Sequence, residues 1–223
     1  MTVLITGATR GIGKALAEKF VMEGHGVIGT GRPGQAKPIM EKATWLELDL
    51  SSGESIAQCA AEAASLGMPI DILVNNAGVL EDEDETAVVP ELLRKTLEVN
   101  VVGTADFTER IIPLMSPSGH IVNISSTAGS LELTDDKVSH YPGHYPAYKI
   151  SKAALNMYGR TLAGTLAEKG ITVSSVHPGW VRTDMGGPEA DMSPEEAAAD
   201  IYAFAISKPA TGGFWFKGNR LPW

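Results

Sequence analysis

Short apolar segments alternate along the chain with longer segments in which apolar residues recur every three or four positions. The longer segments predict amphipathic helices, here at residues 12–20, 88–115 and 147–168. Strands that alternate with helices form βαβ units, so we expect an α/β fold with a doubly wound parallel sheet. The short segments predict its strands, at residues 3–5, 27–30, 45–48, 70–74, 120–124, 171–176 and 214–216.

Polar residues mark where several of these helices begin and end. Ser51 and Glu54 have the spacing of a capping box, which predicts a helix from there to about residue 66. The segment 193–196, Ser-Pro-Glu-Glu, predicts another helix start with proline in its first position. Gly170 follows the helix predicted at 147–168 and is expected to end it.

The composition favours one domain spanning residues 1–223, because 223 residues with 43% apolar side chains can form one substantial core. The net charge of −9, with both signs interspersed, argues against binding to nucleic acid or an anionic membrane. Cys59 is the only cysteine, which excludes an internal disulfide and suggests a small buried side chain. The first strand begins at residue 2 or 3 and no apolar run approaches about 18 residues. We therefore expect a cytoplasmic protein.

A glycine-rich turn, Gly7-x-x-x-Gly11-x-Gly13, follows the first strand and opens the first helix. Glycines let the backbone approach a diphosphate, and the N-terminus of a helix offers free N–H groups to it. The spacing differs from the common G-x-G-x-x-G pattern, so a tight turn without a ligand remains the alternative at this point.

Tyr148 and Lys152 are four residues apart in a predicted helix, which places them on one face. A cation about 4 Å from a phenol is worth about 4 kcal/mol at an effective dielectric near 20, so the tyrosine pKa could fall to about 7 to 8. The alternative is an ordinary solvated face. Tyr145 and Lys149 have the same spacing, but Pro146 is expected to begin the helix and leave Tyr145 in the loop.

These motifs occur in an order that resembles the short-chain dehydrogenases/reductases, and the finer likeness is to the C-factor and sniffer carbonyl-reductase branch. The resemblance spans the chain and implies the strand order 3-2-1-4-5-6-7 in a Rossmann-type sheet. The segments that carry it are Thr6-Gly7-x-x-x-Gly11-x-Gly13, Asn75-Asn76-Ala77-Gly78, Asn100, Ser125-Ser126, Tyr148-x-x-x-Lys152 and Pro178-Gly179.

The resemblance implies four catalytic residues, Asn100, Ser126, Tyr148 and Lys152. Ser126 is preferred to Ser125, since the family serine is the second of the pair. The implied cofactor contacts include Asp49 at the adenine, residues 75–78 beneath the ribose and 178–183 over the nicotinamide. The full implied set is Gly7, Thr9, Arg10, Gly11, Ile12, Gly13, Arg32, Asp49, Leu50, Asn76, Ala77, Gly78, Tyr148, Lys152, Pro178, Gly179, Val181 and Thr183.

Thr30-Gly31-Arg32 stands at the end of the second predicted strand, where an NAD-preferring enzyme places a carboxylate for the ribose 2′-hydroxyl. Arg32, with Arg10, can bind a 2′-phosphate instead, so NADP(H) is the preferred cofactor and NAD(H) stays open. The alternative is that either arginine simply points into water.

Two clusters of polar residues raise the question of a metal. The run Glu81-Asp82-Glu83-Asp84-Glu85 is interpreted as a solvated loop, because five adjacent like charges lack ligand geometry. His140 and His144 have no evident third ligand. We therefore predict no metal.

The expected reaction is reversible reduction of a ketone or aldehyde, with NAD-dependent oxidation of a secondary alcohol or cofactor sensing as alternatives. The partner is a small carbonyl or alcohol, contacted by loops near 80–88, 127–147 and 184–192. The loop before Tyr148 is extended compared with the compact members of the family. A homodimer or homotetramer fits the family, and a monomer stays open.

Overall fold

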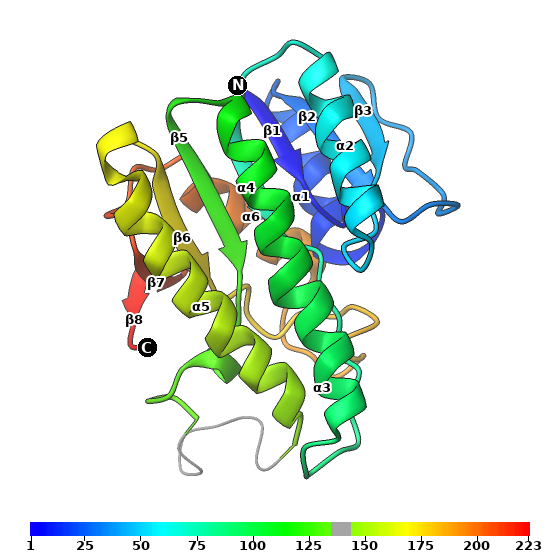
Figure 1. Ribbon diagram of the computed structural model, residues 1–223, viewed down its shortest axis with the longest axis vertical. Helices are drawn as coiled ribbons and strands as arrows, with labels where there is room; N and C mark the ends of the chain where they lie inside the picture. The colour runs from blue at the N-terminus through cyan, green and yellow to red at the C-terminus, as the bar shows by residue number, and fades with distance from the viewer. Residues whose placement is uncertain (135–143) are drawn as a thin grey trace.

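The computed structural model describes residues 1–134 and 144–223. Its sheet has eight strands in the order β3-β2-β1-β4-β5-β6-β7-β8, so the predicted order is confirmed and one strand is added (Figure 1). β8 pairs antiparallel with β7, and the other pairs are parallel. The strands are β1 Thr2–Ile5, β2 Gly26–Gly31, β3 Ala43–Glu47, β4 Ile70–Asn75, β5 Met115–Ile124, β6 Thr172–Val176, β7 Gly213–Phe216 and β8 Asn219–Leu221.

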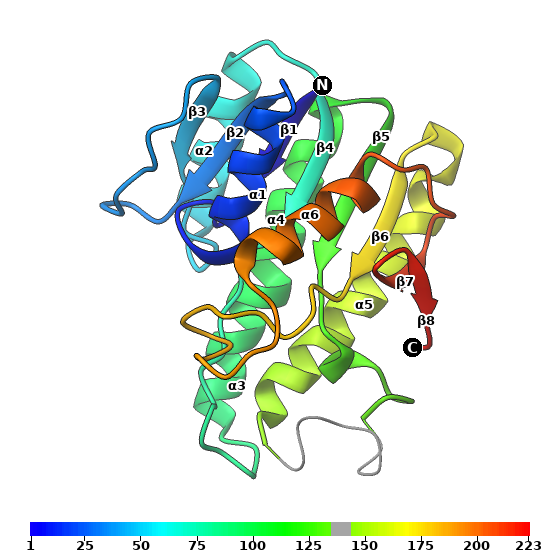
Figure 2. The same ribbon diagram turned by 180° about the vertical axis from the view of Figure 1, so that it is seen from behind.

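Helices cover both faces of this sheet. α1 and α6 lie together on one face (Figure 2), and α2, α4 and α5 lie on the other (Figure 1). α3 packs against α5 beyond the carboxyl ends of the strands (Figure 1). The helices are α1 Gly11–Met22, α2 Gly53–Ser65, α3 Pro90–Leu97, α4 Thr104–Ile111, α5 Pro146–Leu166 and α6 Pro194–Ala205.

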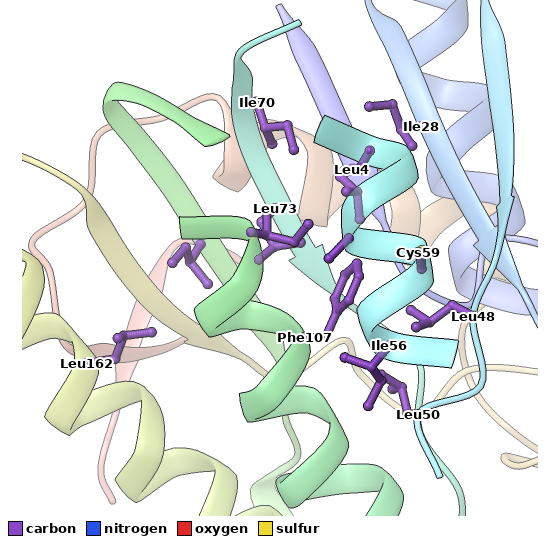
Figure 3. Close-up of a cluster of buried hydrophobic side chains, with 14 of the residues drawn as sticks. Leu4, Ile28, Leu48, Leu50, Ile56, Cys59, Ile70, Leu73, Phe107 and Leu162 are labelled. Atoms are coloured by element: carbon purple, nitrogen blue, oxygen red, sulfur yellow. The ribbon is translucent and has the colours of Figure 1, made fainter. Parts of the chain in front are cut away.

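The two covered faces explain why consecutive residues of β1 and β4 are apolar, as in Val3-Leu4-Ile5 and Ile72-Leu73-Val74. Successive side chains of a strand point to opposite faces. In β1, Leu4 belongs to the core with Leu73 and Phe107 (Figure 3), whereas Val3 and Ile5 belong to the core under α1 and α6. Both faces are therefore buried, as the parallel sheet requires.

The long helical pattern at 88–115 is interrupted in the structure. A π-helical segment, Glu98–Gly103, separates α3 from α4. Gly103 sits against β3's outgoing loop, where a Cβ would lie 1.9 Å from the carbonyl oxygen of Leu50. β5 begins at Met115, earlier than the predicted 120.

Two further predictions about the elements fail and two are confirmed. Ser52, not Ser51, caps α2, because its Oγ accepts from the N–H of Ser55. The predicted edge strand 214–216 is an inner strand, since β8 covers it. The capping box at Ser193 is present, and Gly170 ends the long helix with φ of +70°.

Candidate active site

A cavity of about 850 Å³ opens at the carboxyl ends of the central strands. This edge is where a doubly wound sheet receives a ligand. Asn100, Ser126, Gly179 and Val181 are not among the described residues that line the cavity. The predicted residues that do line it are Gly7, Thr9, Arg10, Gly11, Ile12, Gly13, Arg32, Asp49, Leu50, Asn76, Ala77, Gly78, Tyr148, Lys152, Pro178 and Thr183.

The glycine turn forms one wall of the cavity. Gly7 and Gly11 have φ of +66° and +52°, a conformation that favours glycine. At Gly13 a Cβ would lie 2.3 Å from the carbonyl oxygen of Gly7, so no larger residue fits. Asn76 fastens the turn to the end of β4, since its Nδ2 donates to the carbonyls of Thr6 and Gly7 at 2.9 and 3.2 Å. The turn therefore presents backbone to the cavity.

Lys152 lies buried beside Tyr148. Its Nζ donates to the carbonyl oxygen of Ile124 at 2.9 Å and lies 5.4 Å from the centre of the Tyr148 ring. Burial lowers the pKa of Lys152 to about 8, because the ammonium loses its hydration. The charged form still predominates at neutral pH, so a cation stands next to the phenol.

Asn100 connects the end of β4 to α5. Its Oδ1 accepts from the N–H of Val79 at 2.8 Å, and its Nδ2 donates to the carbonyl of Val79 and to Oγ of Ser151. Ser151 in turn donates to the carbonyl of Tyr148 at 2.8 Å. The side chain of Asn100 therefore links the segment after β4 to α5. Sequence reasoning did not identify Ser151 as part of this connection.

Two serines follow β5, and Ser125, not the predicted Ser126, is the one that lines the cavity. Ser125 Oγ donates to Asn156 Oδ1 at 2.6 Å, which is a structural role, although Ser125 also lines the cavity. Ser126 Oγ accepts from the N–H of Ala128 at 3.1 Å and caps a short turn, Thr127–Gly129. The hydroxyl is the acceptor in that bond, so its own proton can be donated elsewhere.

The opposite end of the cavity is formed by β2 and the loop after it. Arg32 and Gln35 both line it. Gln35 Oε1 accepts from Thr9 Oγ1 and from the N–H of Arg32, each at 3.1 Å. A Cβ at Gly31 would lie 2.3 Å from Thr9 Cγ2, so a carboxylate side chain there would require Thr9 to move. Nothing in the sequence pattern singled out Gln35.

Two charged groups near this end already form an ion pair or hydrogen bonds with other residues of the chain. Arg10 forms an exposed ion pair with Asp184, from the loop before α6. Asp49 accepts from the Oγ and the N–H of Ser51, and these hydrogen bonds lower the pKa of Asp49. Asp184 would compete with a phosphate for Arg10, which the sequence did not indicate.

The acidic run differs from its prediction at one residue. Glu81, Glu83 and Asp84 are exposed, but Asp82 is buried and its carboxylate accepts from the backbone of α5. The interpretation as a solvated loop is therefore wrong for Asp82, because a contact distant in sequence holds it inside.

Cys59 and Tyr145 have the positions that the sequence predicts. Cys59 is buried, which raises the pKa of its thiol to about 12, as expected for a structural cysteine. Tyr145 precedes α5, as predicted. Within 1–134 and 144–223, no group of three His, Cys, Asp or Glu residues has the arrangement of a metal site. His140 lies outside the described residues.

Comparison with known proteins decides the family. The family model described as short chain dehydrogenase matches residues 1–194. The chain belongs to the short chain dehydrogenase family. A curated relative, the short-chain dehydrogenase anuI of Penicillium roqueforti, is 32% identical over 220 residues, covering 91% of this chain and 87% of the relative.

Solved structures resemble this short-chain dehydrogenase along its whole length. A short-chain dehydrogenase/reductase from Burkholderia multivorans, solved with bound NADP, has a TM-score of 0.88 and 28% identity, covering 100% of this chain and 99% of that one. The carbonyl reductase Sniffer of D. melanogaster gives the same four values. The likeness to Sniffer supports the branch that the sequence motifs indicated. Among the helices described here, none combines the length and apolar character needed to cross a membrane.

Proposed function

We propose that this short-chain dehydrogenase uses NADP(H) to interconvert a small ketone or aldehyde and the corresponding alcohol. Residues 1–223 would act as one cofactor-binding and catalytic unit. The observation that carries the proposal is the juxtaposition of Lys152 and Tyr148 on the wall of a cavity that also contains the glycine turn.

The cavity fits a dinucleotide. The turn at Gly7 and Gly13 excludes side chains and leaves its backbone open, which suits a diphosphate at the start of α1. The rest of the cavity runs along the carboxyl ends of the strands, from Asp49, where the adenine would lie, to Tyr148, where the reaction would occur. When bound, the nicotinamide would supply or receive the hydride.

The preference for NADP(H) rests on the other end of the cavity. Arg32 lines it, and Gly31 stands where an enzyme selecting NAD carries a carboxylate, which here would collide with Thr9. A 2′-phosphate there would receive charge-assisted hydrogen bonds from Arg32, and from Arg10 once Asp184 is displaced. The Burkholderia multivorans structure with NADP supports the same choice.

Tyr148 would move the proton at the substrate oxygen. In reduction its hydroxyl gives a proton to that oxygen, and in oxidation its phenolate takes one. The ammonium of Lys152 favours the phenolate by its charge. Ser126 would donate its hydroxyl hydrogen bond to the same oxygen, which holds the carbonyl in place. Asn100 would hold the segment after β4 and the helix α5 in fixed positions around these groups.

The proposal is tested by following cofactor absorbance with a panel of small ketones and aldehydes, each with NADPH and with NADH. We expect consumption of NADPH with formation of an equal amount of alcohol, and at least about tenfold lower kcat/KM with NADH. Absence of turnover with every carbonyl, or alcohol oxidation that uses NAD alone, would contradict it.

A further inference from the structure

The N-terminus of α5 has no side-chain cap from its own N-cap residue. Tyr145, in the N-cap position, has φ of +61° and makes no side-chain cap hydrogen bond. Pro146 follows it and has no N–H. The first helical donors are therefore the N–H groups of Ala147 and Tyr148, whose acceptors must come from outside the helix.

Asp82 supplies the missing acceptor from a distant part of the chain. Its Oδ2 accepts from the N–H of Ala147 at 2.6 Å and its Oδ1 from the N–H of Tyr148 at 3.3 Å. The Asp82 residue is only 2% exposed. The N–H of Tyr145 also donates to the carbonyl of Glu85 at 3.2 Å. The loop that precedes α3 is thus fastened to the first turn of α5 (Figures 1 and 2).

We propose that Asp82 is a positioning residue for Tyr148 and also sets how readily the phenol ionises. The carboxylate holds the backbone N–H of Tyr148 itself, so it fixes the point from which the phenol projects into the cavity. The Asp82 carboxylate contacts the backbone of Tyr148, and its negative charge opposes ionisation of the phenol, whereas the ammonium of Lys152 favours it. The inference rests on the proposed role of Tyr148 in proton transfer.

Several other charges act on Tyr148 and remain in place when Asp82 is changed. Lys149 and Lys152 belong to the same helix, and Glu81 and Glu85 to the same loop as Asp82. The other charged residues that line the cavity are Arg10, Arg32, Asp49, Arg94, Lys95, Glu98, Arg182 and Asp184. A substitution at Asp82 alone therefore changes only one of the charges that affect ionisation of the Tyr148 phenol.

The test compares Asp82→Asn with Asp82→Ala, using alcohol oxidation with saturating NADP⁺ across pH 5 to 9. Asparagine keeps an oxygen for the N–H of Ala147, but it removes the charge and the second oxygen, which accepts from the N–H of Tyr148. We expect the midpoint at which the rate rises to move down by about 0.5 pH unit in Asp82→Asn, since the phenolate loses a nearby negative charge. In Asp82→Ala the cap is also lost, and we expect kcat to fall about tenfold or more, with partial recovery in Asp82→Asn.

Asp84 provides the matched control, because it lies in the same acidic run and is exposed. Asp84→Asn should have the wild-type midpoint and kcat. If Asp82→Ala does not fold, the midpoint of Asp82→Asn decides alone. A wild-type midpoint in Asp82→Asn, or an equal shift in Asp84→Asn, would overturn the inference.

The Tyr148→Phe variant separates this inference from the proposed function. If Tyr148→Phe keeps turnover, the proposed function fails and the inference fails with it. If Tyr148→Phe loses turnover while Asp82→Asn keeps the wild-type midpoint, only the inference fails.

Discussion

Replacing Lys152 with methionine should stabilise the protein at neutral pH while it abolishes catalysis. Lys152 is buried, and burial lowers its pKa from 10.5 to about 8. At about 1.4 kcal/mol per pKa unit, holding the charged form inside costs about 3 kcal/mol at pH 7. Methionine removes that cost but leaves the carbonyl of Ile124 without its donor, a loss of about 1 to 3 kcal/mol. The net gain in unfolding free energy is therefore about 1 kcal/mol.

The difference in unfolding free energy between Lys152→Met and wild type should change with pH. The folded-state pKa of Lys152 is lower than the unfolded-state value, so between about 8 and 10.5 the unfolded chain binds more protons. The stability contribution from this group in the wild type should therefore rise with pH in that window. Lys152→Met lacks this contribution, so its advantage at pH 7 should shrink above pH 8 and then reverse.

Urea unfolding of both proteins between pH 6.5 and 9.5 measures the effect. Lys169→Met is the control, because Lys169 is exposed and its replacement should change stability little at any of these pH values. A difference between Lys152→Met and wild type that stays constant from pH 7 to 9.5 would refute the claim that burial depresses the pKa of Lys152.

Three further predictions concern the cofactor. Arg32→Ser should raise the NADPH KM about 10- to 100-fold and leave that for NADH nearly unchanged, which steady-state kinetics would show; an equal loss with both cofactors would contradict it. Gly13→Ala should abolish dinucleotide binding in a fluorescence titration, since its Cβ would lie 2.3 Å from the carbonyl oxygen of Gly7; wild-type affinity would count against the turn. Asp184→Asn should tighten NADPH binding about two- to fivefold in the same titration, because Arg10 is released; unchanged affinity would mean that the ion pair does not compete.

Local sequence patterns predicted those parts of the structure that depend on neighbouring residues. The apolar strands, the spacing of Tyr148 and Lys152 and the capping box at Ser193 depend on strand or helix periodicity, and the structure contains them. The edge strand β8 was missed because Asn219–Leu221 is short and mainly polar.

Contacts between distant segments account for what the sequence could not predict. Asp82 is buried because it meets α5 about 65 positions later in the chain, and nothing within its acidic run distinguishes it from Asp84. The pairing of Asp184 with Arg10 could not be predicted either, because the two residues are far apart in the sequence and meet only in the folded chain. The choice of Ser52 over Ser51 as the cap of α2 follows from Asp49, which engages Ser51.

Turnover by Tyr148→Phe with NADPH tests the central claim most directly. The variant keeps the aromatic ring beside Lys152 and loses only the hydroxyl that would transfer the proton. We predict NADPH binding within about twofold of wild type and a kcat at least about 100-fold lower, with Tyr145→Phe retaining activity as the control. Undiminished turnover in Tyr148→Phe would show that the proton comes from another group.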